Sequence, residues 1–235
     1  MPYKINCKKK IDENLLTVIN LLNQNKIKYW LCHGSLLGLM RDKQLLDWDH
    51  DIDIGILNNT FLIRIIKTLM RQHGFKIINK SNDKHDSTIK FIRPGGKEID
   101  FNLYKIRGKK IAIVWPYPGK IFCKIIDAFA LEKKYKGKFK IIPIISKYLA
   151  FLFKFIKKIM VKKELFFSYA GYCHDEKYIK HLDYVKLNYC KISIPNHYQN
   201  YLVDLYGKKW KRKIKTFNWV NDSPSTIKYE SSKKF

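Results

Sequence analysis

The stretch from residue 41 to residue 53 reads RDKQLLDWDHDID, and it follows directly on CHGSLLG at residues 32–38. A Gly-Ser turn at the start of a helix, followed by a D-x-D pair on an apolar strand, is typical of enzymes that hold a nucleoside diphosphate through magnesium. We therefore expect a metal-dependent transferase.

The D-x-D spacing predicts a metal site. Side chains at positions i and i+2 of a strand share a face, so Asp51 and Asp53 project together while Ile52 and Ile54 point into the core. Two carboxylates that close repel each other unless a cation sits between them, and Mg²⁺ prefers such oxygen ligands. If the strand extends back far enough, Asp49 joins this face, either as a ligand or as a charge behind the ligands.

The upstream segment predicts a phosphate site. Residues 28–32 favour a short strand, and Gly34 lets the backbone approach a ligand. Ser35 is the expected N-cap of a helix over residues 36–40, whose free N–H groups attract anions. We expect Arg41 to reach the same phosphates. His33 flanks the site, where it could touch substrate or serve a structural role.

A third carboxylate is expected from a separate strand. Residues 97–104 alternate between polar and apolar side chains, which places Glu98, Asp100 and Asn102 on one face. Asp100 is the best candidate for a third metal ligand, or for the base that takes a proton from an attacking hydroxyl. The alternatives are Glu98 in that role, or an ordinary acidic residue on the solvated face of an edge strand.

Taken together, these residues resemble a known family. The segments YWLCHGSLLG at 29–38, Arg41 and WDHDIDIG at 48–55 are similar to the signature of the LicD/fukutin-type nucleotidyltransferase-fold proteins. A later piece, IPNHY at 194–198 with LYG at 205–207 and Trp210, resembles that family's closing motif. The family usually has Gly-Thr at the position of Gly34-Ser35, and often Ile-Pro at the position of Leu46-Asp47.

The resemblance implies transfer of a phosphorylated alcohol, phosphocholine or a polyol phosphate, from a CDP-linked donor to a cell-surface glycan. It also implies Mg²⁺, with Mn²⁺ as a substitute. Carried over by position, Gly34 and Ser35 match the phosphate-side turn, Asp51 and Asp53 the paired metal ligands, and Asp100 the third acidic position. Nothing in the match identifies the alcohol.

The expected fold is α+β, with a nucleotidyltransferase-like mixed sheet and helices in a catalytic core over residues 1–130. Helices are expected over about 11–25 and 59–73, with strands near 75–79, 88–93, 98–106 and 110–115. Residues 131–235 are expected to form a basic, mostly helical region packed on that core.

The net charge of +27 is unevenly distributed, with eleven lysines between residues 131 and 163 against Glu132 alone. Over residues 144–163, four lysines fall on one helical stripe and five apolar side chains fall on the opposite one: Lys147, Lys154, Lys158 and Lys162, against Leu149, Leu152, Phe153, Ile156 and Met160. Such a helix suits an anionic membrane surface. It equally suits packing on the catalytic domain with solvated lysines.

The five cysteines are odd in number and widely spaced, without a C-x-x-C motif, so neither a zinc site nor a disulfide framework is expected. The N-terminus lacks the apolar stretch of a signal peptide, and no run approaches the roughly twenty apolar residues that span a bilayer. These features favour a cytoplasmic protein, peripheral on the inner face of the membrane if the basic helix binds lipid.

Two other functions remain open. The same motifs serve nucleotidyltransferases that add a nucleotide to RNA, a protein or a small molecule. A non-catalytic basic protein that binds membranes or nucleic acid would also carry this charge. The chain shows no RNA-binding motif and its aromatic residues lie in apolar segments, so nucleic acid is not the expected partner.

Overall fold

The structure is a computed structural model, and it describes residues 3–5, 11–78, 87–130, 141–187, 190–214 and 216–230. The chain divides into two compact units. The first contains residues 1–80, 87–113 and 172–226, and the second contains residues 81–86, 114–171 and 227–235. This division differs from the expected boundary at residue 130, because the chain returns to the first unit at Tyr172.

A mixed sheet forms the centre of the first unit. Strand β3 (Asp51–Leu57) pairs antiparallel with β2 (Trp30–Leu31) and parallel with β6 (Glu98–Arg107). Strand β5 (Thr88–Ile92) pairs antiparallel with both β6 and β4 (Lys76–Ile77). Strands β7 (Lys110–Pro118), β8 (Phe167–Asp175) and β11 (Thr226–Tyr229) each contribute residues to both units.

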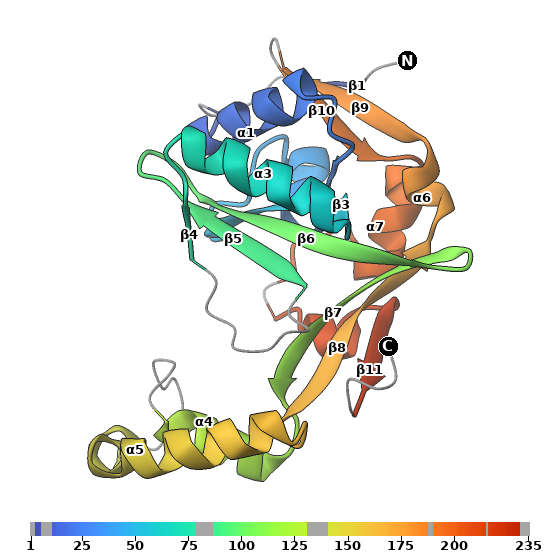
Figure 1. Cartoon of the computed structure of the whole chain (residues 1–235). Coiled ribbons are helices and arrows are strands. Elements are labelled where there is room, and N and C mark those ends of the chain that lie inside the picture. Colours follow the sequence, from blue (N-terminus) through green and yellow to red (C-terminus); the bar gives the residue numbers. More distant parts are fainter. Residues whose placement is uncertain are drawn as a thin grey trace. The chain divides into compact units, whose positions relative to one another are not determined.

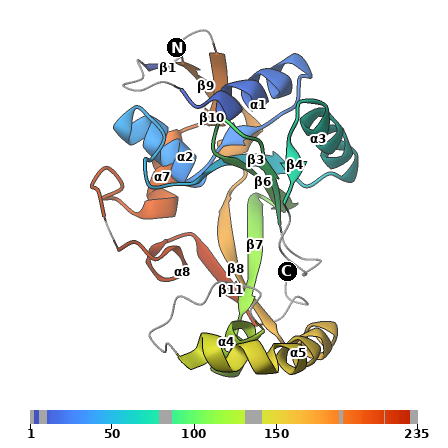
Figure 2. The ribbon, with the colours of Figure 1, turned by 90° about the vertical axis from the view of Figure 1, so that its left-hand side faces the viewer.

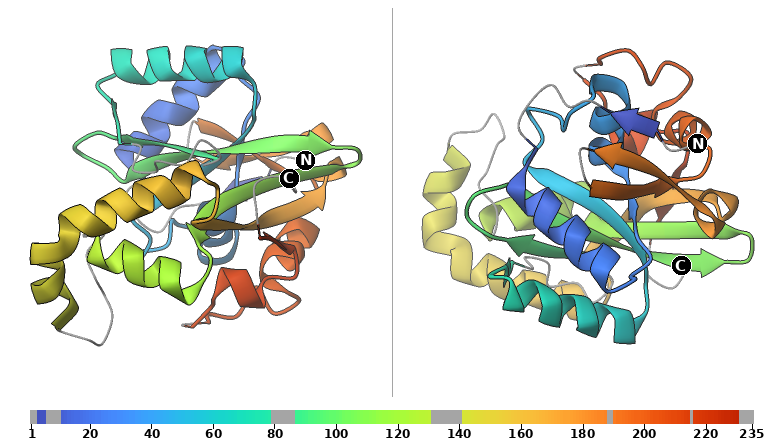
Figure 3. Two further views of the ribbon diagram at one scale, coloured as in Figure 1. Left: turned by 60° about the horizontal axis from the view of Figure 1, so that its bottom comes forward. Right: turned by 90° about the horizontal axis from the view of Figure 1, so that it is seen from above.

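Helices α1 (Glu13–Gln24) and α3 (Thr60–Gln72) lie side by side over one face of this sheet (Figure 1, Figure 3). The Asp12 carboxylate accepts hydrogen bonds from the first turn of α1, and the Asn59 side chain accepts one from the first turn of α3. Helix α1 buries its apolar stripe, which contains Leu15, Val18, Ile19 and Leu22. The expected α+β class, with helices on a mixed sheet, is confirmed.

The C-terminal part contributes strands as well as helices. Strand β9 (Leu182–Leu187) pairs parallel with β1 (Tyr3–Ile5) and antiparallel with β10 (Cys190–Pro195) in a second, three-stranded sheet. Short helices α6 (Lys177–Lys180), α7 (Tyr198–Tyr206) and α8 (Trp219–Asp222) accompany these strands. The expectation of a mostly helical region therefore left out strands β8 to β11.

The second unit contains a helical pair, α4 (Ile121–Phe129) and α5 (Ile141–Lys162), which lie side by side (Figure 2). Cys123, Ile126 and Phe166 form its buried core. Lys157 Nζ donates to Asp127 Oδ1 at 2.9 Å, which links α5 to α4. Among the described residues, no helix combines the length and the apolar character that crossing a bilayer requires.

Candidate active site

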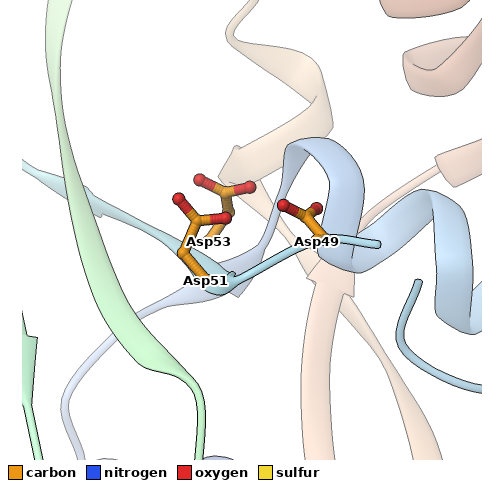
Figure 4. A group of neighbouring side chains, drawn as sticks. All are labelled: Asp49, Asp51 and Asp53. Carbon is orange, nitrogen blue, oxygen red and sulfur yellow. The ribbon is translucent and has the colours of Figure 1, made fainter. Parts of the chain in front are cut away.

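Three aspartates converge where β3 begins. Asp51 and Asp53 lie on the strand itself, while Asp49 precedes it, and each offers an oxygen that lies within 4.8 Å of the others (Figure 4). For Asp49 to share this face, β3 would have to extend back to residue 49, but the strand begins at Asp51. The preceding loop brings this carboxylate to the pair instead.

The electrostatics of this acidic cluster (Asp49, Asp51 and Asp53) are unfavourable without a cation. Burial, together with the charge of Asp51, raises the pKa of Asp53 to about 7. Burial also raises the pKa of Asp49 to about 7, with Asp51 again contributing. Because a cation among the three carboxylates would stabilise their ionised forms, the cluster is suited to a metal ion.

The loop that carries Asp49 is held by contacts from both sides. Lys97 Nζ donates to the carbonyl oxygen of Leu46 at 3.1 Å and to that of Asp49. A Cβ atom at Gly34 would collide with Asp49 Oδ2, so a larger residue there would force the Asp49 carboxylate to move. Gly34 thus serves a close approach, as the sequence predicted, but the group that approaches is a carboxylate of the protein itself.

Asp53 is positioned by hydrogen bonds from two elements. Its backbone N–H donates to Ser35 Oγ at 2.9 Å, and Asn102 Nδ2 donates to its Oδ1, also at 2.9 Å. Thr88 Oγ1 donates to Asn102 Oδ1 at 3.2 Å, which fixes the amide orientation. Sequence reasoning placed Asn102 on the face of Asp100 but assigned it no role.

Ser35 is not the N-cap that the sequence predicted. Helix α2 spans His33–Leu37 and passes into a π-helical turn, η1 (Gly38–Asp42), so Ser35 lies inside the helix. Cys32 occupies the N-cap without a side-chain hydrogen bond. The Ser35 hydroxyl instead ties this helix to β3. The helix start that was expected to attract phosphate therefore lies at His33 and not at residue 36, and phosphate binding there stays a prediction.

Asp100 lies beside the acidic cluster on the neighbouring strand, in register with Asp53. Lys90, opposite Asp100 on β5, forms an ion pair with Asp100 Oδ2, and its Nζ is 3.9 Å from Asp51 Oδ2. Asp100 Oδ1 is buried and has no hydrogen-bond partner among the described residues. Burial raises the pKa of Asp100 to about 7, although Lys90 opposes this shift.

Lys90 was not identified from the sequence. Its position in the strand 88–93 was predicted, but only the register between β5 and β6 shows that it faces Asp100. In the structure its ammonium group supplies positive charge beside the carboxylates. Lys90 is therefore a functional candidate that sequence patterning alone did not reveal.

Arg41 and His33 are engaged by protein groups. The Arg41 guanidinium forms two hydrogen bonds with the Asp42 carboxylate, at 2.9 and 3.1 Å. His33 Nε2 lies 2.7 Å from the Tyr104 hydroxyl. Burial lowers the pKa of His33 to about 4, so its ring is neutral at pH 7 and does not attract phosphate by charge. Substrate contacts for both residues stay predictions.

The side chains present fit a magnesium-type ion. Carboxylate oxygens are the only ligand atoms in the acidic cluster, which is the donor set that Mg²⁺ and Mn²⁺ prefer. The buried, unpartnered Oδ1 of Asp100 adds a further oxygen on the adjacent strand. The four aspartates expected from the sequence, Asp49, Asp51, Asp53 and Asp100, thus lie in one region of the first unit.

Comparisons with known proteins support the resemblance seen in the sequence. Residues 26–121 match the family model described as LicD/FKTN/FKRP, nucleotidyltransferase domain. An uncharacterized protein of Rickettsia typhi is 32% identical over 119 residues, which are 49% of this chain and 35% of that protein. The ribitol 5-phosphate transferase FKRP of Homo sapiens is 38% identical over 50 residues, which are 21% of this chain and 10% of that protein.

Among solved structures, the lincosamide antibiotic adenylyltransferase LnuA has a TM-score of 0.42 and 13% identity, over 83% of this chain and 86% of that chain. The match to the two relatives named above spans little more than a third of the Rickettsia typhi protein and a tenth of FKRP. The family match covers β2 through β7, with the acidic cluster and Asp100 inside it. Residues 26–121 of this chain are therefore similar to the nucleotidyltransferase domain of the LicD/FKTN/FKRP family.

Proposed function

We propose that the protein is a Mg²⁺-dependent transferase that moves a phosphorylated alcohol from a CDP-linked donor to a glycan. The observation that carries this proposal is the group of three carboxylates at the start of β3, inside the segment that matches the family. The name of the relative FKRP, a ribitol 5-phosphate transferase, makes polyol phosphates the first donors to test, with phosphocholine as the other candidate.

The acidic cluster is the proposed metal site. A divalent cation held by Asp49, Asp51 and Asp53 would screen the negative charge of the donor pyrophosphate. Ser35 and Asn102 keep Asp53 in place for this task, since each bonds to it at 2.9 Å. Lys97 and Gly34 do the same for Asp49, through the loop contact and the close approach described above.

Asp100 is the proposed proton acceptor. In the reaction an acceptor hydroxyl forms a bond to the transferred phosphorus, the bond from this phosphorus to the CMP oxygen breaks, and the hydroxyl proton must leave. The raised pKa of Asp100, about 7, matches the requirement of a base that works near neutral pH. Lys90 pairs with Oδ2 of this carboxylate, while Oδ1 is buried and has no hydrogen-bond partner among the described residues.

Calorimetric titration of the purified chain tests this function. CDP-ribitol, CDP-glycerol, CDP-choline and ATP are each added with Mg²⁺ or with EDTA, to the wild type and to Asp51→Asn/Asp53→Asn. The proposal predicts Mg²⁺-dependent binding of one CDP-alcohol, lost in the double variant. Asp47→Asn, an exposed change two residues before Asp49, is the control and should bind as the wild type does.

Other outcomes of the titration would redirect the proposal. Preference for ATP over every CDP-alcohol would favour a nucleotidyltransferase that adds a nucleotide to its acceptor. Absence of Mg²⁺-dependent binding by all four compounds would contradict the transferase function altogether.

A further inference from the structure

Helix α5 has an inner apolar face that is already used. Phe153, Ile156 and Met160 pack against the core around Cys123 and Ile126 of α4. These three residues belong to the predicted apolar stripe, which was expected either to bind lipid or to pack on the rest of the protein. They pack within the protein. The side chains of Lys147 and Leu149, which complete the predicted stripes, lie outside the described residues.

A second apolar face of α5 points to solvent. Phe151, Phe155 and Ile159 recur at every fourth position and so form one row along the helix. Phe151 is 86% exposed and Phe155 is 56% exposed, and Leu152 beside them is also exposed. Helix α4 adds further exposed apolar side chains, namely Ile121, Phe122 and Ile125. Since monomeric proteins rarely expose large apolar groups together, this surface is suited to a partner.

Lysines line the same face. Lys154, Lys158 and Lys162 are exposed and recur at every fourth position, and Lys154 and Lys158 each lie three residues after a phenylalanine of the row. Residues three apart are neighbours on a helix surface, so the basic row runs directly beside the apolar one. The helix contains no acidic residue. The inward-facing Lys157 pairs with Asp127 of α4, so its charge is balanced within the protein.

We propose that this outer face of α5 docks on an anionic lipid bilayer. The phenylalanines enter the boundary between headgroups and acyl chains, and the lysines contact lipid phosphates. An uncharged apolar partner would leave the basic row without counter-charges, whereas a nucleic acid backbone would leave the phenylalanine row in water. An anionic bilayer satisfies both rows. The inference concerns the second unit alone, so it does not depend on the proposed catalytic function.

Vesicle sedimentation of the full chain tests the proposal. Because a chain with net charge +27 binds any anionic surface at low salt, the assay is run at about 0.15 M salt, where the Debye length is about 8 Å. The vesicles contain phosphatidylcholine alone or mixed with phosphatidylglycerol. Three variants are compared with the wild type: Phe151→Ser/Phe155→Ser, Lys154→Gln/Lys158→Gln/Lys162→Gln, and the control Phe61→Ser.

Phe61 is a matched control because it is 71% exposed on α3, in the first unit. The proposal predicts that the wild type binds the anionic vesicles in preference to the neutral ones. The phenylalanine variant should bind about tenfold more weakly or worse, since it loses two interfacial side chains. The lysine variant should bind about 100-fold more weakly, at about fivefold for each of the three charges near the surface. Phe61→Ser should bind as the wild type does.

Three results would overturn the proposal. The first is failure of the wild type to sediment with anionic vesicles. The second is binding by the phenylalanine variant that is as tight as that of the wild type. The third is a loss of binding in Phe61→Ser as large as in that variant. In the second case the binding would be a general effect of net charge. Since the substituted side chains are exposed, the variants should keep the wild-type circular dichroism spectrum and melting temperature, which are measured alongside.

Discussion

Replacing Asp53 with asparagine should stabilise the metal-free protein while abolishing its response to Mg²⁺. The substitution removes one negative charge from the acidic cluster and keeps the shape of the side chain. Asparagine can still accept the hydrogen bond that Asn102 donates to Oδ1. The expected gain therefore comes from electrostatics and not from new contacts.

The magnitude follows from the pKa of Asp53, which burial raises from 3.8 to about 7. Each unit of pKa shift corresponds to about 1.4 kcal/mol. Ionisation of a fully desolvated Asp53 would therefore destabilise the folded protein by about 4 kcal/mol above pH 7. Because Asp53 is only partly shielded from solvent, we expect about half of this, or about 2 kcal/mol. For a chain of this size that corresponds to a rise in melting temperature of about 4–8 °C.

The sign of the pH dependence is fixed by the direction of this shift. The folded protein binds the proton of Asp53 more tightly than the unfolded chain does, so the cost is absent below pH 4 and complete above pH 7. Thermal melts at about pH 8 and about pH 5, with Mg²⁺ or EDTA, measure the effect. The advantage of Asp53→Asn should shrink as the pH falls, and Mg²⁺ should stabilise the wild type only. A lower melting temperature than the wild type in EDTA, or a Mg²⁺ response like the wild type's, would refute the reasoning.

Three further substitutions have defined outcomes. Gly34→Ala should displace the Asp49 carboxylate and reduce transferase activity by up to about 100-fold, measured as CMP release, with the wild-type melting temperature retained. Lys90→Met should leave Asp100 without its counter-charge and cost about 2 kcal/mol in urea unfolding, and added Mg²⁺ should recover part of that loss. Burial lowers the pKa of His174 to about 3, so as the pH falls below about 6.5 this histidine is protonated in the unfolded chain but not in the folded protein. Acid therefore destabilises the folded protein. His174→Leu should reduce the stability lost between about pH 8 and pH 5.5 by about 1.4 kcal/mol.

Each of these has an outcome that would count against it. Unchanged CMP release from Gly34→Ala would show that the Asp49 position is not critical. If Lys90→Met stabilises the protein, the Lys90–Asp100 ion pair does not offset the free energy that burying the Asp100 carboxylate costs. A pH dependence of His174→Leu identical to that of the wild type would exclude this histidine as a source of acid sensitivity.

Local patterns in the sequence were enough to predict most elements of the first unit. Helices α1 and α3 begin after Asp12 and Asn59, which are strong N-cap residues, and their apolar stripes have helical spacing. Strand β3 combines alternating isoleucines with the D-x-D pair, so the pattern predicts both that the segment is a strand and which of its faces points into the core. The resemblance to the family, now confirmed by the match over residues 26–121, rested on the same residues.

Features that depend on tertiary contacts were not predictable in the same way. Asp49 joins the acidic cluster through a loop that Lys97, far away in sequence, holds in place. Ser35 faces a backbone amide of β3 instead of capping a helix, because α2 starts two residues before it. The partnership of Lys90 with Asp100 depends on the register of β5 against β6.

The helical expectation for the C-terminal part missed strands β8 to β11 for a similar reason. The amphipathic pattern of α5 is strong and local, and the helix was predicted. Strands β9 and β10 pair with each other and with β1, from the opposite end of the chain. Such long-range pairing leaves only short alternating segments in the sequence, which are easily attributed to surface helices.

The central claim is that the acidic cluster of Asp49, Asp51 and Asp53 binds a divalent metal ion. Titration of Mn²⁺ into the purified chain, followed by electron paramagnetic resonance of the free ion, tests this most directly, because it requires neither donor nor acceptor. We predict one saturable site in the wild type, competed by Mg²⁺ and lost in Asp51→Asn/Asp53→Asn, with Asp47→Asn unaffected. Equal Mn²⁺ binding by the wild type and the double variant, or no saturable site in either, would contradict the account.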